Sequence, residues 1–454
     1  MKKSFILLVG SIICSFSFAQ TNPAITSWLQ NTTITGSYYM SGNSTVIQDD
    51  VLANVQLVQY NDDWVYVNTN GIPSYPTGPF SDGNPSLASS QNAIFRIPLS
   101  PTENTGIHTN THGGNIGIFI NGVALFDFRD GVGWDSNTNS LCGGPGNPPC
   151  PGGQMAATDW SRDAIPAEKS GFDCSKGHPA MGNYHHHQNP SAFKLDIDVV
   201  SNICNLYDAE GLYSIDPDQH SPLIGFAYDG FPIYGAYGYT NKDGSGGITR
   251  IKSSYYLRNI TERTQWADGK DVDHGPDIST TYPIGYFKED YEYVENEGED
   301  FLDEHNGRFC VTPEYSDGTY AYFATVDENW NSTYPYVVGP TFYGNETAVK
   351  VTTVPGNVSV YTVTSVEDNF LGDVSFTVFP NPSQEFIAVQ INDLVSSDVS
   401  LKLYDLNGSL VREAKIVQGS TIWYLDVETL YDGVYILELT NGVQVKSTKV
   451  VISK

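Results

Sequence analysis

The stretch Ile116-Gly117-Ile118-Phe119-Ile120 runs directly into the turn pair Asn121-Gly122. Branched and aromatic side chains favour extended backbone, and Asn-Gly supplies the left-handed conformations that a tight hairpin turn needs. Similar short runs bounded by turns occur at residues 55–60, 64–67 and 93–97. No helical pattern is longer than about ten residues, and no repeat of fixed period is evident. The pattern predicts an all-β, loop-rich fold.

The composition agrees with this fold and argues against several functional classes. The 454 residues include 29 Tyr, 43 Gly and 25 Pro, and 13% of them are aromatic. A disordered acidic chain would be poor in aromatic residues, so the chain is expected to fold. The formal net charge of −29 repels phosphate groups, and no basic patch stands out. We therefore expect no nucleic-acid partner.

The first 19 residues have the layout of a signal peptide. Two lysines precede a mostly apolar run, and Ser17-Phe18-Ala19 places small residues where signal peptidase cuts. The apolar run is shorter than the roughly 20 residues of a spanning helix, and no later stretch could span a membrane. A lipoprotein with Cys14 as acceptor is disfavoured because Ile13 stands where a small residue is expected. We expect cleavage after residue 19 and export with no membrane span.

Export makes disulfide bonds possible, and five cysteines follow the signal peptide. Cys142 and Cys150 close a short loop rich in Gly and Pro, which has few other means of holding its shape. We expect these two cysteines to be joined. Cys174 and Cys204 are the next candidate pair, and Cys310 is left unassigned.

Histidines concentrate in the middle of the chain, where all nine fall between His108 and His305. The densest group is the three consecutive histidines of the run Tyr184-His185-His186-His187. On a strand, His185 and His187 would point to one face, about 6.5–7 Å apart at the backbone, and His186 would point to the other. Two imidazoles on one face can bind one metal ion.

His178 and Asp173 lie just upstream of this run, and Gly177 and Gly182 allow the chain to fold back toward it. The predicted metal ligands are His185, His187, His178 and Asp173. Imidazole ligands suit zinc, copper, nickel or iron, and we expect copper or zinc. The alternative is that these histidines are structural and only form hydrogen bonds within the sheet.

A domain boundary lies near residue 370. Beyond it, short alternating segments are broken by Asn-Gly turns, the pattern of a small antiparallel sandwich of immunoglobulin-like type. The chain is therefore predicted to be a large single β domain followed by a small immunoglobulin-like β-sandwich. The predicted organisation is a signal peptide at 1–19, a loose leading segment at 20–35, a β domain at 36–350, a linker at 351–373 and the sandwich at 374–454.

The tail carries several motifs in a set order. They include Tyr404-Asp405-Leu406-Asn407-Gly408, and their most distinctive residues are Pro380, Asn381, Pro382, Gly433, Tyr435, Lys446 and Lys449. With these motifs, residues 374–454 resemble the type A C-terminal sorting domain of the type IX secretion system of Bacteroidota. The resemblance implies transport by that machinery across the outer membrane and removal of the tail. Release from the cell or attachment to surface lipopolysaccharide would follow.

The large domain carries a second set of ordered motifs, at residues 117–123, 173–178, 184–187, 224–235, 302–320 and 334–340. With these motifs, residues from about 36 to 345 resemble the YHYH domain family, named after a Tyr-His-Tyr-His sequence. His186 replaces the second tyrosine, and Tyr320-Ala321-Tyr322 has alanine where a second histidine would be expected. The family's activity is poorly defined, so the resemblance implies a domain and no reaction.

Three functions therefore compete. The first is a secreted or cell-surface protein that binds a transition metal through its histidine cluster. The second is a non-catalytic surface or glycan-binding module with structural histidines, its ligand unidentified. The third is a metal- or carboxylate-dependent enzyme that acts on an extracellular polymer. No nucleophile elbow, zincin helix or phosphate loop occurs, so the catalytic residues stay unknown.

Overall fold

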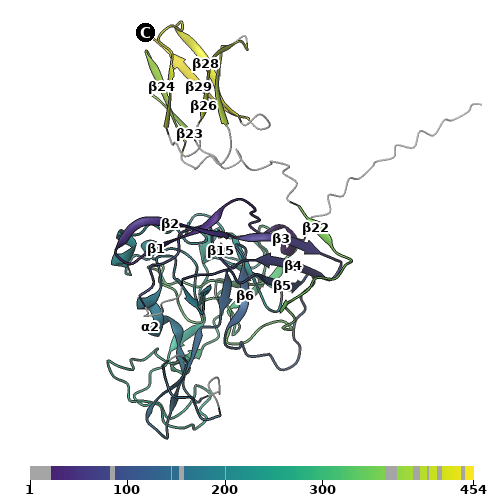
Figure 1. Cartoon of the computed structure of the whole chain (residues 1–454), viewed down its shortest axis with the longest axis vertical. Coiled ribbons are helices and arrows are strands. Elements are labelled where there is room, and N and C mark those ends of the chain that lie inside the picture. Colours follow the sequence, from purple (N-terminus) through teal and green to yellow (C-terminus); the bar gives the residue numbers. More distant parts are fainter. Residues whose placement is uncertain are drawn as a thin grey trace, which may run out of the picture. The chain divides into compact units, whose positions relative to one another are not determined.

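The computed structural model describes residues 22–81, 87–144, 146–152, 158–199, 201–362, 376–391, 399–405, 408–416, 422–440 and 445–454. The chain forms two compact units, Met1–Thr362 and Val363–Lys454, and is mostly β, as the sequence predicts (Figure 1). The predicted signal peptide and Cys14 lie outside the described residues, as does the turn residue Asn407. No helix among the described residues is long and apolar enough to cross a membrane.

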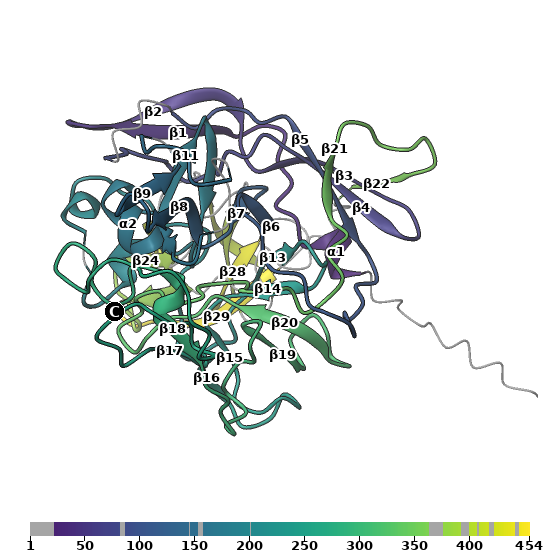
Figure 2. The ribbon, with the colours of Figure 1, turned by 90° about the horizontal axis from the view of Figure 1, so that it is seen from below.

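An eight-stranded sheet forms the centre of the first unit, and Figure 2 shows its middle strands side by side. Its strands are, in spatial order, β11 (Gly177–Ala180), β12 (Asn183–His186), β7 (Ala124–Phe126), β6 (Asn115–Phe119), β13 (Leu223–Ala227), β14 (Pro232–Tyr234), β20 (Thr319–Phe323) and β19 (Gly307–Cys310). We call β11, β12, β7 and β6 the first half and the other four strands the second half.

The two halves are related by an approximate two-fold axis. Strands β6 and β13 pair antiparallel with Ile118 opposite Phe226, so the axis passes between these two residues. Outside them, β12 runs parallel to β7, and β20 runs parallel to β14 in the same register. Each half ends in an antiparallel hairpin, β11–β12 or β19–β20. The sheet therefore contains an internal repeat.

The repeat extends to the hydrogen bonds of an aspartate before each hairpin. Asp173 accepts bonds from the backbone amides of Ser175 and Gly177 and from the Tyr184 hydroxyl. In the second half Asp303 makes the same bonds. It accepts from the backbone amides of His305 and Gly307 and from the Tyr320 hydroxyl. The spacing of equivalent residues grows along the chain because loops of different length separate the strands, which explains why the sequence shows no fixed period.

The glycines of this motif are required by close packing. A Cβ on Gly177 would lie 2.4 Å from the Tyr184 hydroxyl oxygen, and one on Gly307 would lie 2.3 Å from that of Tyr320. Each tyrosine thus crosses the backbone of the facing strand where only glycine leaves room.

A five-stranded antiparallel sheet is the second large element of this unit. In spatial order it contains β21 (Val349–Val351), β5 (Ala93–Pro98), β4 (Trp64–Thr69), β3 (Val55–Tyr60) and β22 (Ser359–Tyr361). Residues 359–361, which the sequence assigned to a linker, therefore form an edge strand of this unit. The leading segment is also well packed, because it contains α1 (Pro23–Thr26) and the buried indole of Trp28.

Smaller elements complete the first unit. They are the β-sheets β1 (Thr35–Met40) with β2 (Asn43–Leu52), β10 (Ser161–Asp163) with β8 (Arg129–Asp135) and β9 (Ser140–Gly143), β15 (Tyr237–Tyr239) with β16 (Ile248–Arg250), and β17 (Tyr255–Leu257) with β18 (Tyr291–Tyr293). The helical segments are α2 (Ala164–Glu168), η1 (Lys169–Gly171), η2 (Phe193–Leu195), η3 (Asn202–Asn205) and η4 (Lys288–Asp290).

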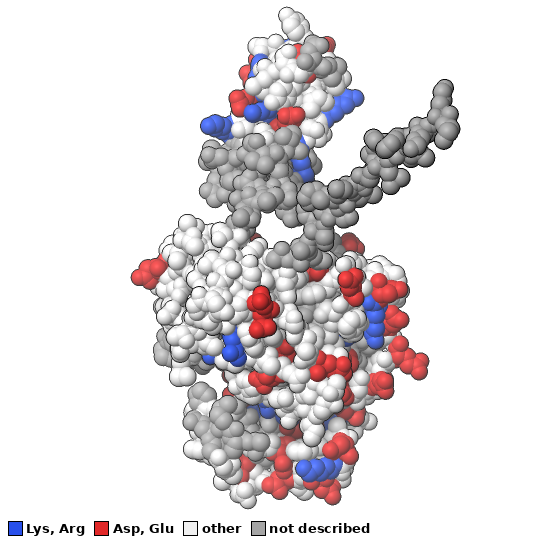
Figure 3. All heavy atoms as spheres, turned by 90° about the vertical axis from the view of Figure 1, so that its right-hand side faces the viewer, with Lys and Arg blue, Asp and Glu red and all other residues white. Residues whose placement is uncertain are grey.

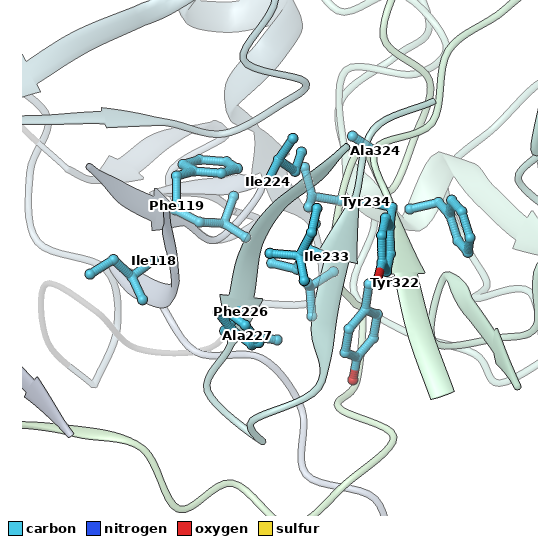
Figure 4. Packing of buried hydrophobic residues seen from close by; sticks show 14 of the residues in the cluster. Ile118, Phe119, Ile224, Phe226, Ala227, Ile233, Tyr234, Tyr322 and Ala324 are labelled. Atoms are coloured by element: carbon cyan, nitrogen blue, oxygen red, sulfur yellow. The ribbon is translucent and has the colours of Figure 1, made fainter. Parts of the chain in front are cut away.

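The main core packs against the middle of the eight-stranded sheet. Figure 4 shows Phe119, Ile224 and Ile233 packed together there, and all three side chains are fully buried. Consecutive residues of β13 are buried, as expected for a strand covered on both faces. This core supports the central strands, on whose flanks the two hairpins lie.

The second unit contains two small antiparallel sheets with a core of their own, consistent with the predicted sandwich. One sheet has β23 (Phe376–Phe379), β24 (Phe386–Ile391) and β27 (Ile422–Asp426), and the other has β26 (Leu410–Ile416), β25 (Val399–Tyr404), β28 (Gly433–Thr440) and β29 (Val445–Ile452).

Candidate metal centre

The β11–β12 hairpin places histidines on one face of the sheet. His178 lies directly opposite His185 in the antiparallel pair. The turn between the strands uses Met181 at φ 50° and Gly182 at φ 84°, and positive φ at both positions suits the twist of a hairpin. His187 directly follows β12, two residues beyond His185, and returns to the same face.

The three imidazoles converge. The Nε2 atoms of His185 and His187 are 3.0 Å apart, and the ligand atoms of His178, His185 and His187 all lie within 4.8 Å of one another. Each of the three residues is at most 6% exposed. The structure thus brings together three of the four predicted ligands.

Main-chain carbonyl groups hold the two closest rings. The Nδ1 atom of His185 is 2.9 Å from the Asn183 carbonyl oxygen, and that of His187 is 2.5 Å from the Asp127 carbonyl oxygen. A carbonyl oxygen only accepts, so each Nδ1 carries the proton. The neutral rings therefore present two Nε2 lone pairs to each other, and a cation between them would relieve that repulsion. A histidine that binds a metal through one ring nitrogen typically donates the N–H of its other ring nitrogen in this way.

A carboxylate that the sequence analysis did not select joins the cluster. Glu168 is the last residue of α2, and its Oε2 lies 3.3 Å from His178 Nε2 and 3.4 Å from His187 Nε2. The Asp163 side chain caps this helix by accepting the backbone N–H of Ile165. No spacing in the sequence marks Glu168, because only the tertiary fold brings α2 beside the hairpin.

These separations fit a four-coordinate metal ion. With metal–nitrogen distances of about 2.0–2.1 Å, neighbouring ligand atoms of a tetrahedron lie about 3.3–3.4 Å apart. Three of the six separations among the four ligand atoms are 3.0, 3.3 and 3.4 Å, and the three histidine ligand atoms all lie within 4.8 Å of one another. Three imidazole nitrogens and one carboxylate oxygen are donors that suit zinc or copper(II).

The surroundings of the cluster favour the neutral forms of His185 and His187. Phe126 stacks on His185 with ring centroids 3.8 Å apart, and Phe172 packs edge-on to His178 at 4.8 Å. Burial lowers the pKa of His185 well below its ordinary value and also lowers the pKa of His187. Burial raises the pKa of Glu168, but its contacts with His178 and His187 outweigh that effect, and the pKa falls.

His186 points to the other face and belongs to a different network. Its Nδ1 lies 3.1 Å from the Lys176 carbonyl oxygen and therefore donates, so its Nε2 accepts the Tyr75 hydroxyl at 2.8 Å. Burial lowers the pKa of His186 to about 3. Both ring nitrogens are thus used within the fold, and His186 is a structural residue.

Asp173, the fourth predicted ligand, lies outside the cluster. Its Oδ2 accepts the backbone N–H of Gly78 and the Tyr184 hydroxyl, and its Oδ1 accepts the hairpin amides described above. Burial raises its pKa to about 7. A carboxylate engaged by these donors anchors the hairpin, and Glu168 is the carboxylate that lies beside the imidazoles of His178 and His187.

The second half carries no equivalent cluster among its described residues. The strand register places Arg308, Ala321 and Phe323 where the first half has His178, His185 and His187. The Arg308 guanidinium lies over the Phe323 ring at 5.3 Å and donates to the carbonyl oxygen of Glu299 at 2.5 Å. A fixed cation thus occupies the second-half position, and among the described residues the three-histidine group belongs to the first half.

The described residues contain two disulfides. Cys142 and Cys150, the pair expected from the sequence, are joined with Cα atoms 4.8 Å apart, and Cys174 is joined to Cys204. Cys310 is a buried free thiol.

The predicted sorting residues of the tail lie where the first strands meet the last. The side chain of Asn381 donates to the Lys449 carbonyl oxygen and accepts the Val451 backbone N–H. Tyr435 is buried and donates to the Tyr431 carbonyl oxygen. Pro380 and Pro382 flank Asn381, Gly433 begins β28, and Lys446 lies on β29 with Lys449.

Comparison with protein-family models gives two matches. The model described as YHYH protein matches residues 94–336, more than half of the chain. The chain belongs to the YHYH protein family. This YHYH protein also matches the secretion system C-terminal sorting domain over residues 377–453. No curated protein matches the sequence.

The second match indicates where the YHYH protein is exported. The sorting domain directs export through the type IX secretion machinery to the cell surface or the outside. The hairpin with its histidines lies inside the YHYH match, so the candidate metal centre belongs to the family domain.

Proposed function

We propose that this YHYH protein binds a transition metal outside the cell through His178, His185, His187 and Glu168, and that the metal is zinc or copper. The observation that carries the proposal is the 3.0 Å approach of two Nε2 atoms whose rings both donate through Nδ1 to carbonyl oxygens. Neutral imidazole lone pairs at this distance favour a shared cation, and burial disfavours a proton as that cation.

Four protein ligands would close a tetrahedral centre, as in structural zinc sites. Glu168 is the ligand nearest to solvent, with 25% of its side chain exposed against 7% for His178 and 3% for His187. Approach to the centre is therefore from the side of Glu168. A bound metal would also tie α2 to the β11–β12 hairpin, two elements far apart in the chain.

We further propose that the exported protein is released or attached to surface lipopolysaccharide after the sorting domain has acted. The match to that domain supports this step, because the domain directs export to the outside.

Metal content tests the proposal directly. Protein purified without metal-affinity chromatography should contain about one zinc or copper per chain by elemental analysis, and His185→Ala/His187→Ala should lose it. The matched control is His112→Ala/His274→Ala, which removes two exposed imidazoles outside the cluster. It should keep the metal.

Stability provides the second measurement. A ligand bound only to the native state raises the melting temperature, so a strong chelator at about pH 7.5 should lower it in the wild type. The chelator should have no effect on His185→Ala/His187→Ala. Absence of metal from the wild type, together with an unchanged melting temperature in chelator, would show that the histidines are structural.

A further inference from the structure

A pocket of about 380 Å³ lies in the second half of the sheet, on the side of Tyr320. Five aromatic residues contribute to its wall. They are Phe231, Phe309, Tyr315, Tyr320 and Tyr343. We call this cavity the second-half pocket. It takes no part in the histidine cluster, whose residues are absent from its lining.

The aromatic rings of the wall pack on one another, and the wall is partly open to solvent. Tyr320 and Tyr343 stack in parallel with centroids 3.6 Å apart, and Phe231 packs edge-on to Tyr343 at 5.4 Å. Phe309 is 60% exposed at this site. Glu103 supplies the only charged side chain among the described residues of the lining.

The internal repeat shows what covers the equivalent surface in the first half. There, Ser89 donates its backbone N–H to the Gly182 carbonyl oxygen at the tip of the β11–β12 hairpin, at 2.8 Å. Phe80 packs against Tyr184 with ring centroids 6.2 Å apart, and Ala88 packs on the same cluster. Residues 87–89 therefore lie along the tip of this hairpin, and Phe80 lies against Tyr184.

In the second half Tyr343 stacks on the buried Tyr320, and the tip of the β19–β20 hairpin at Gly318 lies at the pocket. The register of the two hairpins makes Gly318 the equivalent of Gly182, and Tyr320 that of Tyr184. Both Gly318 and Tyr320 line the second-half pocket. The neighbour closest to a Cβ built on Gly318 is Phe309, from its own hairpin, whereas one on Gly182 would meet Ser89 from the covering segment.

The negative charge of the pocket lining and of the chain favours a positively charged segment. Within the described part of the chain the lining contains a carboxylate and no lysine or arginine, and the chain has a formal net charge of −29. Figure 3 shows carboxylates scattered over one face of the first unit, with few basic side chains among them. An aromatic wall beside a carboxylate is a favourable site for an ammonium or guanidinium group.

We propose that the second-half pocket binds an extended, cationic segment of a partner polypeptide. The segment runs along the tip of the β19–β20 hairpin near Gly318, as residues 87–89 run along β11–β12. A lysine or arginine side chain lies against the aromatic wall beside Glu103. Main-chain bonds supply affinity in this mode of recognition, and the side-chain pocket supplies specificity.

Fluorescence anisotropy with two labelled peptides tests the proposal on the full chain. One peptide is capped Ala-Gly-Pro-Phe-Arg-Ala-Ser, whose Gly-Pro-Phe core copies residues 78–80, and the other has Glu in place of Arg. The Arg peptide should bind about tenfold more tightly than the Glu peptide. Glu103→Gln should reduce this preference, and Phe309→Ala should weaken both peptides.

Exposed positions outside the pocket provide matched controls. Glu262→Gln and Ile107→Ala make the same kinds of change at exposed sites and should leave binding unchanged. Phe309 and Glu103 are themselves exposed, so their variants should fold normally, which circular dichroism can verify. The proposal is wrong if neither peptide binds at about 1 mM, or if binding is indifferent to both pocket variants. Tighter binding of an uncharged oligosaccharide would also overturn it.

Discussion

The Nε2 atoms of His185 and His187 face each other across 3.0 Å, while a main-chain carbonyl oxygen holds the Nδ1 atom of each ring. The carbonyl groups select the tautomer and the orientation at once, so the ring geometry is set by the backbone before any ion binds. Such preorganisation lowers the entropy lost on binding. The centre therefore depends on the hairpin and on the loop that carries Asp127 as much as on the ligands.

Replacement of Glu168 tests its place in the cluster. Glu168→Gln removes the negative charge but keeps a similar shape, so metal affinity should fall by about tenfold or more in competition with a calibrated chelator. Glu304→Gln is a matched control, because Glu304 lies 3.6 Å from His305 Nε2, outside the cluster. Equal affinities for both variants would remove Glu168 from the ligand set.

Buried Asp229 should make stability depend on pH. Burial raises its pKa to about 6, against an unfolded value of about 3.9. Between these values the native state holds the proton that the unfolded state has lost, so the free energy of unfolding falls as pH rises from about 4 to about 6. This contribution is fully present below the unfolded pKa and is lost above the folded one. A shift of about two units corresponds to about 3 kcal/mol.

Urea unfolding of wild type and Asp229→Asn, both in chelator, measures this effect. The variant has no titrating group at that position, so its stability relative to the wild type should rise by about 2 kcal/mol between about pH 4 and about pH 7. Any hydrogen bond that the side-chain amide of the variant fails to make with the Tyr322 hydroxyl or the Gly344 amide costs the same free energy at both pH values. This cost therefore cancels when the two pH values are compared. A pH-independent difference would show that Asp229 does not titrate in this range.

The repeated aspartate–tyrosine motif predicts paired effects of two glycine substitutions. Gly177→Ala and Gly307→Ala would each push a Cβ into a tyrosine hydroxyl, so each should lower the free energy of unfolding by about 1–3 kcal/mol. Gly356→Ala is the control, since nothing lies within 4 Å of its Cβ position. Chemical denaturation would contradict the repeat if only one of the two variants differed from the control.

Processing should remove the sorting domain. Intact-mass measurement on protein secreted by its native host should find a chain that lacks the sorting domain, residues from about 374 to 454, since such domains act during export. The first unit has its own hydrophobic core and contains all four candidate ligands, so the processed protein should keep its metal. A secreted protein that retains the tail would contradict the prediction.

The sequence by itself determined the elements whose signals are local. Alternating apolar residues with Asn-Gly turns predicted the β fold, and the spacing of His185 and His187 predicted their shared face, because a strand alternates its side chains strictly. The motif order of the tail predicted the sorting domain. The loop between Cys142 and Cys150 could be recognised because its partners lie close along the chain.

Only the tertiary structure decided which upstream residues join the two histidines. Asp173 and Glu168 are both carboxylates near the hairpin in sequence, but backbone amides and a tyrosine hydroxyl engage Asp173, while a short capped helix brings Glu168 to the imidazoles. The internal repeat was hidden for the same reason. Its equivalence lies in strand register and in the aspartate contacts, and loops of unequal length separate the equivalent residues along the chain. Contacts between distant segments depend on how the whole chain packs, and no local pattern encodes them.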